Sequence, residues 1–249
     1  MPSNVSKQLR VPLFNVQIDC ITRKQLLQRF DAGFVVTPNV DHLMMLQDNP
    51  EFLTAYRSVN FIIVDSQIVF WALRFLGRPV PEKISGSDLL PAFCKHHAAN
   101  PNTTIFMLGG MPGVAQAAKN NINSAAGRQI VIAAHSPSMN IGSDPIETTS
   151  IVELINQSKA TCLVVGLGAP KQELWIYNNR HRLAHVKQFL AVGAAIDFEV
   201  GAQRRAPQWM GKMGIEWGFR LLSEPGRLWR RYLVRDPKFY WMLVKEKFL

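Results

Sequence analysis

Two aspartates in this 249-residue sequence stand where a carboxylate could do chemistry. Asp65 follows the apolar run 61–64 directly, so it is either a general base at the end of a strand or the N-cap of the next helix. Asp41, within the segment 37–42 (TPNVDH), has the same two interpretations, and there the sequence favours the cap. For Asp65 too the cap is the more common role of an aspartate at such a position, and the residues alone leave the catalytic interpretation open.

Two further segments have the composition of anion sites. Lys83 lies just before the segment 85–88 (SGSD), which reads either as a loop with a helix cap or as backbone N–H donors beside a cation. The segment 108–114 (LGGMPGV) is a strand, a glycine turn that includes Gly110, and a helix start. Both segments could hold a phosphate, although a glycine turn alone is weak support for nucleotide binding.

The segment 166–173 (GLGAPKQE) is the longest of these motifs. It places Gly168, Lys171 and Gln172 at or near a predicted helix N-terminus, where free backbone N–H groups attract anions. A lysine there opposes the helix macrodipole, which is explained either by an anionic ligand or by simple exposure to solvent. The small residues at 192–195 also permit close backbone approach, by a ligand or by a neighbouring helix.

Several familiar chemistries have no signature in the chain. There is no Walker A loop, complete GxGxxG, CxxC, HExxH or GxSxG motif, which disfavours a protease, an esterase or a zinc enzyme. The adjacent His96 and His97 fall late in a predicted helix and read as surface residues. Cys20, Cys94 and Cys162 are widely spaced in apolar contexts, as expected for reduced cysteines in a cytosolic protein.

These motifs need a scaffold that brings strand ends together. The first 200 residues alternate short apolar runs with amphipathic stretches, which predicts a mostly parallel sheet with helices on both faces. The predicted strands are Phe34–Thr37, Phe61–Val64, Thr104–Leu108, Ile130–Ala133, Cys162–Val165 and Phe189–Val192. The predicted helices are Arg23–Phe30, Asp41–Leu46, Ser66–Phe75, Ser87–His97, Gly113–Asn121, Thr149–Gln157 and Lys171–Arg182. In such α/β folds, sites form at the carboxyl ends of the strands.

The C-terminal fifty residues differ from the rest. They hold +7 of the formal net charge of +10 and four of the six tryptophans, so we expect a boundary near residue 200, with units 1–200 and 201–249. Pro225 and Pro237 divide this basic appendage into about three short helices, each too short to be stable alone. Its composition suits a polyanion, either a nucleic acid or an anionic membrane, or else a solvated face on a helical cap.

No apolar run is long enough to span a bilayer, and the first residues lack the features of a secretory signal. We therefore expect a soluble cytoplasmic protein. Within the appendage, Leu228, Trp229 and Leu233 are predicted to supply apolar area at a membrane surface, with Arg231 and Arg235 on a basic strip beside them.

Taken together, the motifs resemble one family. They follow in order the pattern of the WecG/TagA/CpsF bacterial glycosyltransferases, which include the xanthan-type GumM enzymes, over nearly the whole chain. The matching segments are 37–42, 64–66, 83–88, 109–113, 166–173 and 193–210. The resemblance implies a Rossmann-like α/β domain and a C-terminal membrane-targeting appendage. It also implies inverting transfer of a sugar from a UDP-sugar to a polyprenyl-diphosphate-linked sugar, on the inner face of the cell membrane.

The resemblance also implies roles for single residues. Asp65 matches the presumed general base, and Thr37, Asn39 and Gln172 match substrate contacts. Where many members have arginine, this chain has Lys83, which keeps the charge but loses bidentate geometry.

Arg220, Arg227 and Arg230 match, in spacing, three arginines thought to meet the lipid diphosphate. No metal or other cofactor is expected, because no acidic motif for Mg²⁺ stands out and cationic groups can assist the leaving diphosphate.

Two other function classes compete with this interpretation. The basic appendage could make the protein a nucleic-acid-binding module, although no motif of that class is present and the glycosyltransferase interpretation expects no nucleic acid. A Rossmann-type oxidoreductase is weakened by the missing dinucleotide fingerprint. The sequence does not distinguish an N-acetylmannosaminyl from a glucosyl donor, and it leaves room for a homo-oligomer.

Overall fold

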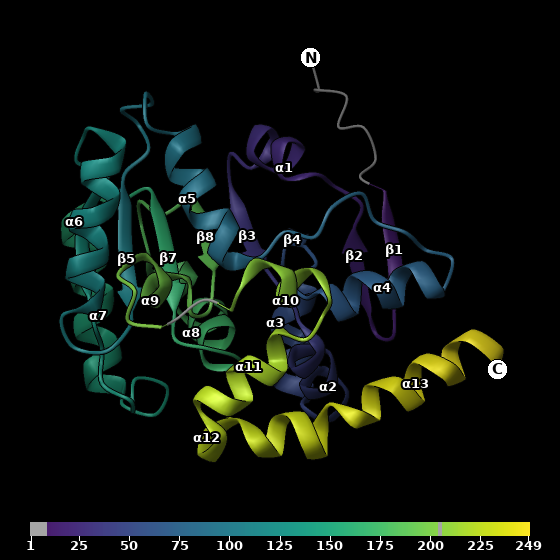
Figure 1. Cartoon of the computed structure of the whole chain (residues 1–249). Helices are drawn as coiled ribbons and strands as arrows, with labels where there is room; N and C mark the ends of the chain where they lie inside the picture. The colour runs from purple at the N-terminus through teal and green to yellow at the C-terminus, as the bar shows by residue number, and fades with distance from the viewer. Residues whose placement is uncertain (1–8, 204–205) are drawn as a thin grey trace.

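Six parallel strands form the central sheet of the computed structural model, which describes residues 9–203 and 206–249, apart from three side chains (Gln208, Lys212 and Arg227). The order of the strands across the sheet is β4-β3-β8-β7-β5-β6 (Figure 1). All six predicted strands are present. They are β3 (Gly33–Val36), β4 (Phe61–Ile62), β5 (Ile105–Gly109), β6 (Val131–His135), β7 (Cys162–Gly166) and β8 (Gln188–Ala191).

Successive side chains along each strand enter two separate apolar cores, as the alternation of a pleated strand requires. In β5, Leu108 belongs to one core and Met107 to the other. The first core is closed by α2 (Val40–Asp48), α3 (Pro50–Arg57), α4 (Gln67–Phe75), α7 (Pro145–Ser158) and α8 (Lys171–Asn179). The second is closed by α1 (Arg23–Arg29), α5 (Gly86–His96), α6 (Val114–Ala126) and α9 (Ala195–Glu199). This arrangement confirms the predicted α/β class.

Some elements were not predicted. A separate antiparallel hairpin, β1 (Arg10–Leu13) and β2 (Val16–Asp19), precedes the sheet and is joined to it by the Asp19 carboxylate, which accepts from the N–H of Ile62 at 2.7 Å. The helices α3 and α9 were also missed, and the predicted helix 171–182 ends in a 3₁₀ turn at Arg180–Arg182.

The N-caps of α4 and α2 decide whether Asp65 and Asp41 are capping residues. Ser66 caps α4 by accepting from the N–H of Val69 at 3.2 Å, and Asn39 caps α2 by accepting from the N–H of His42 at 3.3 Å. The cap interpretation is therefore wrong for both Asp65 and Asp41, because a neighbouring polar residue performs that role in each case.

The C-terminal segment (residues 206–249) contains four short helices and a π-helical turn, where about three helices were predicted. Pro225 and Pro237 begin α12 and α13, as expected for prolines in a first helical turn. The elements are α10 (Gln208–Lys212), α11 (Glu216–Ser223), α12 (Pro225–Arg230), the π-helical turn (Arg231–Arg235) and α13 (Pro237–Phe248). They cross the front and the bottom of the molecule in Figure 1. None of the helices in the described part of the chain is long and apolar enough to cross a membrane.

Helix α13 packs on the first part of the chain through Phe239 and Glu246. Phe239 is fully buried and lies edge-on to Phe14, with ring centroids 5.6 Å apart. The Glu246 carboxylate pairs with Arg78 and accepts from the N–H of Phe14 at 3.1 Å. Leu228 is also buried, which corrects the prediction that it faces a membrane.

Candidate active site

The carboxyl ends of β3 and β4 bring the predicted site residues together. The backbone hydrogen bonds between the β3 and β4 segments continue past the last residues of both strands. The N–H of Asp65, three residues after β4, donates to the carbonyl oxygen of Pro38 at 3.2 Å. The loop that holds Lys83 lies alongside, since the N–H of Ile84 donates to the carbonyl oxygen of Val64 at 2.7 Å. This geometry places Asp65 next to the buried Thr37 and the half-buried Asn39, two of the predicted substrate contacts.

Asp65 has the electrostatic surroundings of a general base. Burial raises the pKa of its carboxyl to about 6, and Glu216 adds to the effect, whereas Arg220, Lys83 and His42 oppose it. At neutral pH the carboxylate is then mostly ionised while remaining a stronger base than an ordinary aspartate. The cap interpretation being excluded, Asp65 is free to accept a proton.

Arg220 comes to this site from α11, more than 150 residues later in the chain. Its guanidinium forms an ion pair with Glu216 at 2.6 Å and lies over the ring of Phe198, with 5.7 Å from the guanidinium carbon to the ring centroid. Burial would lower its pKa, but Glu216 and Asp65 outweigh that effect and raise it. Of the predicted appendage arginines whose side chains the structure describes, Arg220 is the one whose charge acts on the candidate base.

The other two predicted appendage arginines are Arg227 and Arg230. Arg230 is exposed and lies over the ring of its neighbour Trp229 at 5.3 Å. The side chain of Arg227 lies outside the described part of the structure.

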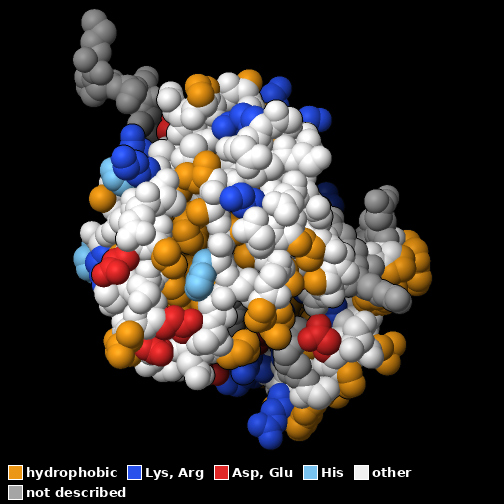
Figure 2. Space-filling view, turned by 90° about the vertical axis from the view of Figure 1, so that its left-hand side faces the viewer, with side chains coloured by type: hydrophobic (Ala, Val, Ile, Leu, Met, Phe, Trp, Pro, Cys, Tyr) orange, Lys and Arg blue, Asp and Glu red, His pale blue; other side chains and the backbone are white. Residues whose placement is uncertain are grey.

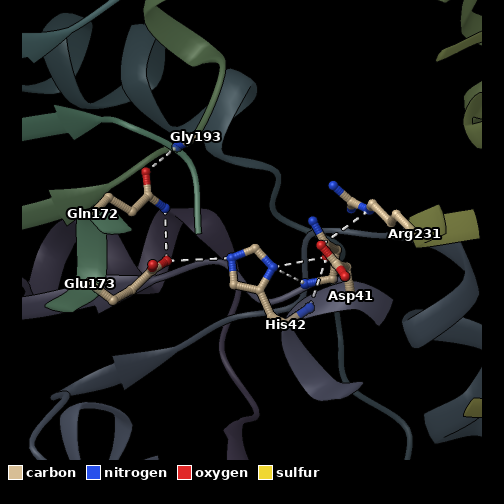
Figure 3. A network of polar contacts seen from close by, with 7 residues as sticks. Asp41, His42, Gln172, Glu173, Gly193 and Arg231 are labelled. Carbon is tan, nitrogen blue, oxygen red and sulfur yellow. Dashed lines mark hydrogen bonds and ion pairs between the residues drawn. The ribbon is translucent and has the colours of Figure 1, made fainter. Parts of the chain in front are cut away.

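A chain of buried polar contacts runs beneath the site (Figure 3). The backbone N–H of Gly193, at the end of β8, donates to Oε1 of Gln172 at 3.1 Å, and Nε2 of Gln172 donates to the Glu173 carboxylate at 2.8 Å. His42 lies on the other side of Glu173, with 3.4 Å between Nε2 and Oε1, and its Nδ1 is 2.8 Å from Oδ1 of Asn39. Gln172 is only 2% exposed, so both ends of this predicted substrate contact are engaged within the protein.

His42, Glu173 and Tyr56 were missed by sequence reasoning. His42 and Glu173 stand inside the quoted motifs, beside Asn39 and Gln172, but their residue types alone gave no reason to single them out. Burial, followed by the charges of Glu173 and Asp65, raises the pKa of the Tyr56 phenol well above its usual value. Tyr56 therefore lies close to both acids, and stays protonated.

Three glycines allow the strand ends on the other half of the sheet to meet closely. A Cβ on Gly109 would lie 2.4 Å from the carbonyl oxygen of Gly166, and one on Gly166 would lie 2.7 Å from that of Gly193. Gly110 has a φ of +72°, and a Cβ there would lie 2.7 Å from the side chain of Val114. Side chains are thus excluded at Gly109 and Gly166 by neighbouring strand ends, and at Gly110 by the first residue of α6.

Lys171 begins α8, as predicted, and its ammonium group donates to the carbonyl oxygen of Met139 at 2.7 Å. This contact joins α8 to the loop between β6 and α7. Among the described residues, no group of three or more His, Cys, Asp or Glu side chains could hold a metal ion.

Comparison with known proteins places the chain in a family. The model of the WecG/TagA/CpsF glycosyl transferase family matches residues 11–249. The chain belongs to this family. It is 27% identical over 252 residues to an N-acetylglucosaminyldiphosphoundecaprenol N-acetyl-beta-D-mannosaminyltransferase of Staphylococcus aureus strain MRSA252, covering 97% of this chain and 95% of the relative. It is 26% identical, with the same coverage, to the protein of that name in strain MW2.

Membership in the WecG/TagA/CpsF family makes this protein a glycosyltransferase and sets aside the oxidoreductase and nucleic-acid-binding alternatives. The match also extends through the C-terminal segment, so that segment is part of what this glycosyltransferase family has in common.

In this glycosyltransferase the π-helical turn is held against α2 by charge. The Asp41 carboxylate pairs with Arg235 at 2.6 Å and with Arg231 at 3.4 Å. Burial raises the pKa of Asp236, in the same cluster, to about 7. Arg231 and Arg235 therefore bind Asp41, while the side chain of Arg235 stays 44% exposed, so the basic strip that the sequence predicts stays a prediction.

We expect Asp41→Ala to weaken the docking of the C-terminal segment by about 1–3 kcal/mol, because it removes a buried partner of two arginines. Amide hydrogen exchange in α12 and α13 should become correspondingly faster. Asp48→Ala is the matched control, since the Asp48–Lys238 pair is exposed at both ends and is worth little. Equal exchange rates in the two variants would show that the Asp41 cluster does not hold the segment.

Proposed function

We propose that the protein is an inverting glycosyltransferase that moves a sugar from a UDP-sugar to a polyprenyl-diphosphate-linked sugar. The observation that carries the proposal is Asp65, a half-buried carboxylate with a pKa of about 6 at the carboxyl edge of the sheet, with Arg220 and Lys83 acting on it. Its family membership supports the reaction class.

In the proposed reaction, Asp65 accepts the proton of the acceptor hydroxyl as that oxygen attacks the anomeric carbon. The bond from that carbon to the diphosphate breaks on the opposite face, which inverts the configuration, and UDP leaves with the bonding electron pair. Thr37 and Asn39 hold sugar hydroxyls in line with Asp65. Gln172, which is buried, supports Thr37 and Asn39 from beneath.

The leaving diphosphate needs hydrogen-bond donors and positive potential. In our proposal these come from the glycine turn at Gly110, the loop at Gly168 and the cationic side chains of Lys83 and Lys171. Lys171 would have to exchange its contact with the Met139 carbonyl for the phosphate, so its contribution depends on rearrangement of that loop.

We further propose that residues 1–200 bind the donor and that residues 201–249 bring the enzyme to its acceptor at the inner face of the cell membrane. Large apolar side chains of the C-terminal segment are exposed, among them Trp209, Leu222, Leu233, Trp241 and Phe248. In Figure 2 hydrophobic side chains gather at the right-hand edge and lower right, with Lys and Arg side chains at the bottom. Apolar and basic groups side by side suit an anionic membrane surface, where Arg220, Arg227 and Arg230 would meet the lipid diphosphate.

The names of the relatives decide which sugar is tested first. The relatives are named for transfer of N-acetylmannosamine to an N-acetylglucosaminyl-diphosphoundecaprenol, which makes that pair the first to test. A glucosyl donor is the second. The decisive experiment incubates the full chain with a panel of UDP-sugars and a polyprenyl-diphosphate-linked monosaccharide, and identifies the product by mass spectrometry. Absence of a disaccharide lipid with every donor would contradict the proposal, as would retained anomeric configuration.

A membrane role can be tested separately by co-sedimentation with vesicles. We expect full-length protein to sediment with vesicles rich in phosphatidylglycerol, and a Leu233→Ser, Trp241→Ser double variant to sediment markedly less. Ile146→Ser is the matched control, since Ile146 is as exposed but lies on α7 of the sheet domain. Equal sedimentation of all three proteins would remove the C-terminal segment from membrane binding.

The placement of the donor diphosphate predicts a difference between two glycines. Gly168 and Gly127 have φ values of +74° and +66°, and a Cβ at either position meets no atom within 4 Å. Alanine at each should therefore cost the same backbone strain, about 1–2 kcal/mol. We expect Gly168→Ala alone to weaken UDP binding, by about tenfold or more, as measured by calorimetry. Unchanged UDP affinity in Gly168→Ala would move the diphosphate away from this loop.

A further inference from the structure

The buried contacts beneath Asn39 fix the orientation of its side-chain amide. The backbone N–H of His42 can only donate, and it points at Oδ1 of Asn39 at 3.3 Å, so this atom must be the amide oxygen. The same oxygen is 2.8 Å from Nδ1 of His42, which must then be the protonated ring nitrogen. The alternative, in which Nδ1 accepts from the N–H of Asn39, has the longer distance of 3.5 Å.

A second backbone group fixes the other end of the chain. The N–H of Gly193 donates to Oε1 of Gln172, so Nε2 of Gln172 must face Oε1 of Glu173, as the 2.8 Å contact shows. Glu173 is fully buried, and among the described residues its only other hydrogen-bond or ion-pair partner is the ring of His42. With Nδ1 already protonated, a favourable contact between Nε2 and Oε1 requires one more proton between them.

Burying a carboxyl group costs free energy unless the group is paired and hydrogen-bonded. An apolar residue of similar volume at this position would give a folded state that is as stable or more stable. The Glu173 Oε2 and Tyr56 hydroxyl, both buried, have no hydrogen-bond partner among the described residues. The cluster is therefore poorly explained as a device for stability alone.

Building on the proposed function, we propose that His42 and Glu173 are positioning residues that share one proton. The pair holds Nδ1–H of His42 on Asn39, so that the amide oxygen of Asn39 faces inward and its NH₂ group faces the sugar. Neither residue touches the substrate. His42 also acts to lower the pKa of Asp65, as do Arg220 of α11 and Lys83 of the loop before α5, while Glu216 of α11 and Tyr56 of α3 complete the titratable surroundings.

The protonated nitrogen can be identified directly. Two-bond proton–nitrogen correlation spectra of the full chain, labelled in histidine, distinguish protonation at Nδ1 from protonation at Nε2 alone, and the His42 signals are those lost in His42→Asn. We expect Nδ1 of His42 to stay protonated from pH 6 to 8 in the wild type. A ring protonated only at Nε2 would overturn the proposal, whether or not any sugar donor has been found.

Two variants of similar shape, His42→Asn and His42→Gln, test whether the contact from Nδ1 of His42 to Asn39 matters for catalysis. Asparagine at position 42 can reproduce the Nδ1–H donor to Asn39, whereas glutamine reproduces only the atom that faces Glu173. We expect His42→Gln to lower kcat/KM by about 10–100-fold, the worth of a hydrogen bond involving a charged group, and His42→Asn to lower it several-fold less. The exposed His185→Gln is the control.

The pH profile separates positioning from a general loss of structure. Both His42 variants remove the ring whose interaction lowers the pKa of Asp65, so the acid limb of kcat/KM should move to higher pH, while His185→Gln leaves it in place. Equal activity of His42→Gln, His42→Asn and wild type, or an unmoved acid limb, would contradict the role of the pair. A wild type inactive with all UDP-sugars would instead contradict the proposed function, leaving the spectroscopic result to decide on the pair.

Discussion

Asp65→Asn is expected to lower kcat by about 10²–10⁴-fold, the usual contribution of a general base, while leaving the protein at least as stable as the wild type. The pKa of Asp65 is raised in the folded state, so the stability that its protonated form contributes is complete below pH 3.8 and is lost as the pH rises through about 6. At pH 7.5 the wild type therefore holds an unfavourable charge that asparagine does not have. We expect the variant to be more stable by about 1–2 kcal/mol after allowing for partial exposure.

The same pKa gives an acid limb in the wild-type pH profile. We expect kcat/KM to fall below about pH 6, because the protonated carboxyl cannot accept the hydroxyl proton. Thermal unfolding measured at pH 7.5 and at pH 4 should show the stability gain of Asp65→Asn only at the higher pH. Asp48→Asn, at an exposed carboxylate, is the control for both measurements. Turnover near the wild-type level in Asp65→Asn would remove this residue from the mechanism.

Arg220→Ala is expected to have the second largest effect, a loss of about 10²–10³-fold in kcat/KM, as for removal of a preorganised charged donor. Arg220 is the charge that most strongly opposes the raised pKa of Asp65. Its removal should therefore also move the acid limb to higher pH. Arg220→Lys keeps the charge but not the planar guanidinium, so it should restore the position of the acid limb more fully than it restores kcat/KM.

Steady-state kinetics with varied lipid acceptor and varied donor will show which substrate depends on Arg220. We expect the larger change in the acceptor, since the arginine comes from the C-terminal segment. Arg57→Ala, at an exposed arginine on α3, is the control for loss of charge. An Arg220→Ala enzyme with an unmoved acid limb and normal acceptor kinetics would place this arginine outside the site.

Much of the sheet domain could be predicted from local sequence signals. Strands buried on both faces give short apolar runs, so all six appeared in the sequence within a few residues of their ends. The helix α3 was missed although Asn49 and Pro50 form an ordinary N-cap and first turn. The hairpin was missed because its four-residue strands have no long alternation, and one of them contains Pro12.

In the site, too, local sequence signals could be interpreted, whereas contacts between residues far apart in the chain could not be predicted. Asp65 could be selected because it directly follows an apolar run, and strand ends of a parallel sheet meet at one edge. The sequence could not reveal that Ser66 would take the capping role, nor that Asp41 would bind two arginines almost 200 residues away. His42 and Glu173 become significant only through the distances between α2 and α8.

The buried Phe239 and the Glu246 contacts also bear on the order in which the working enzyme is made. A ribosome synthesises the sheet domain first, and domains generally begin to fold in that order. Arg220 emerges before α13, the helix whose Phe239 and Glu246 join the C-terminal segment to Phe14 and Arg78 near the start of the fold. In a nascent chain, the strands around Asp65 can thus be folded while Arg220, the opposing charge, is not yet held in place by α13. Transfer competence would then be acquired only after α13 has been synthesised and has packed on Phe14 and Arg78.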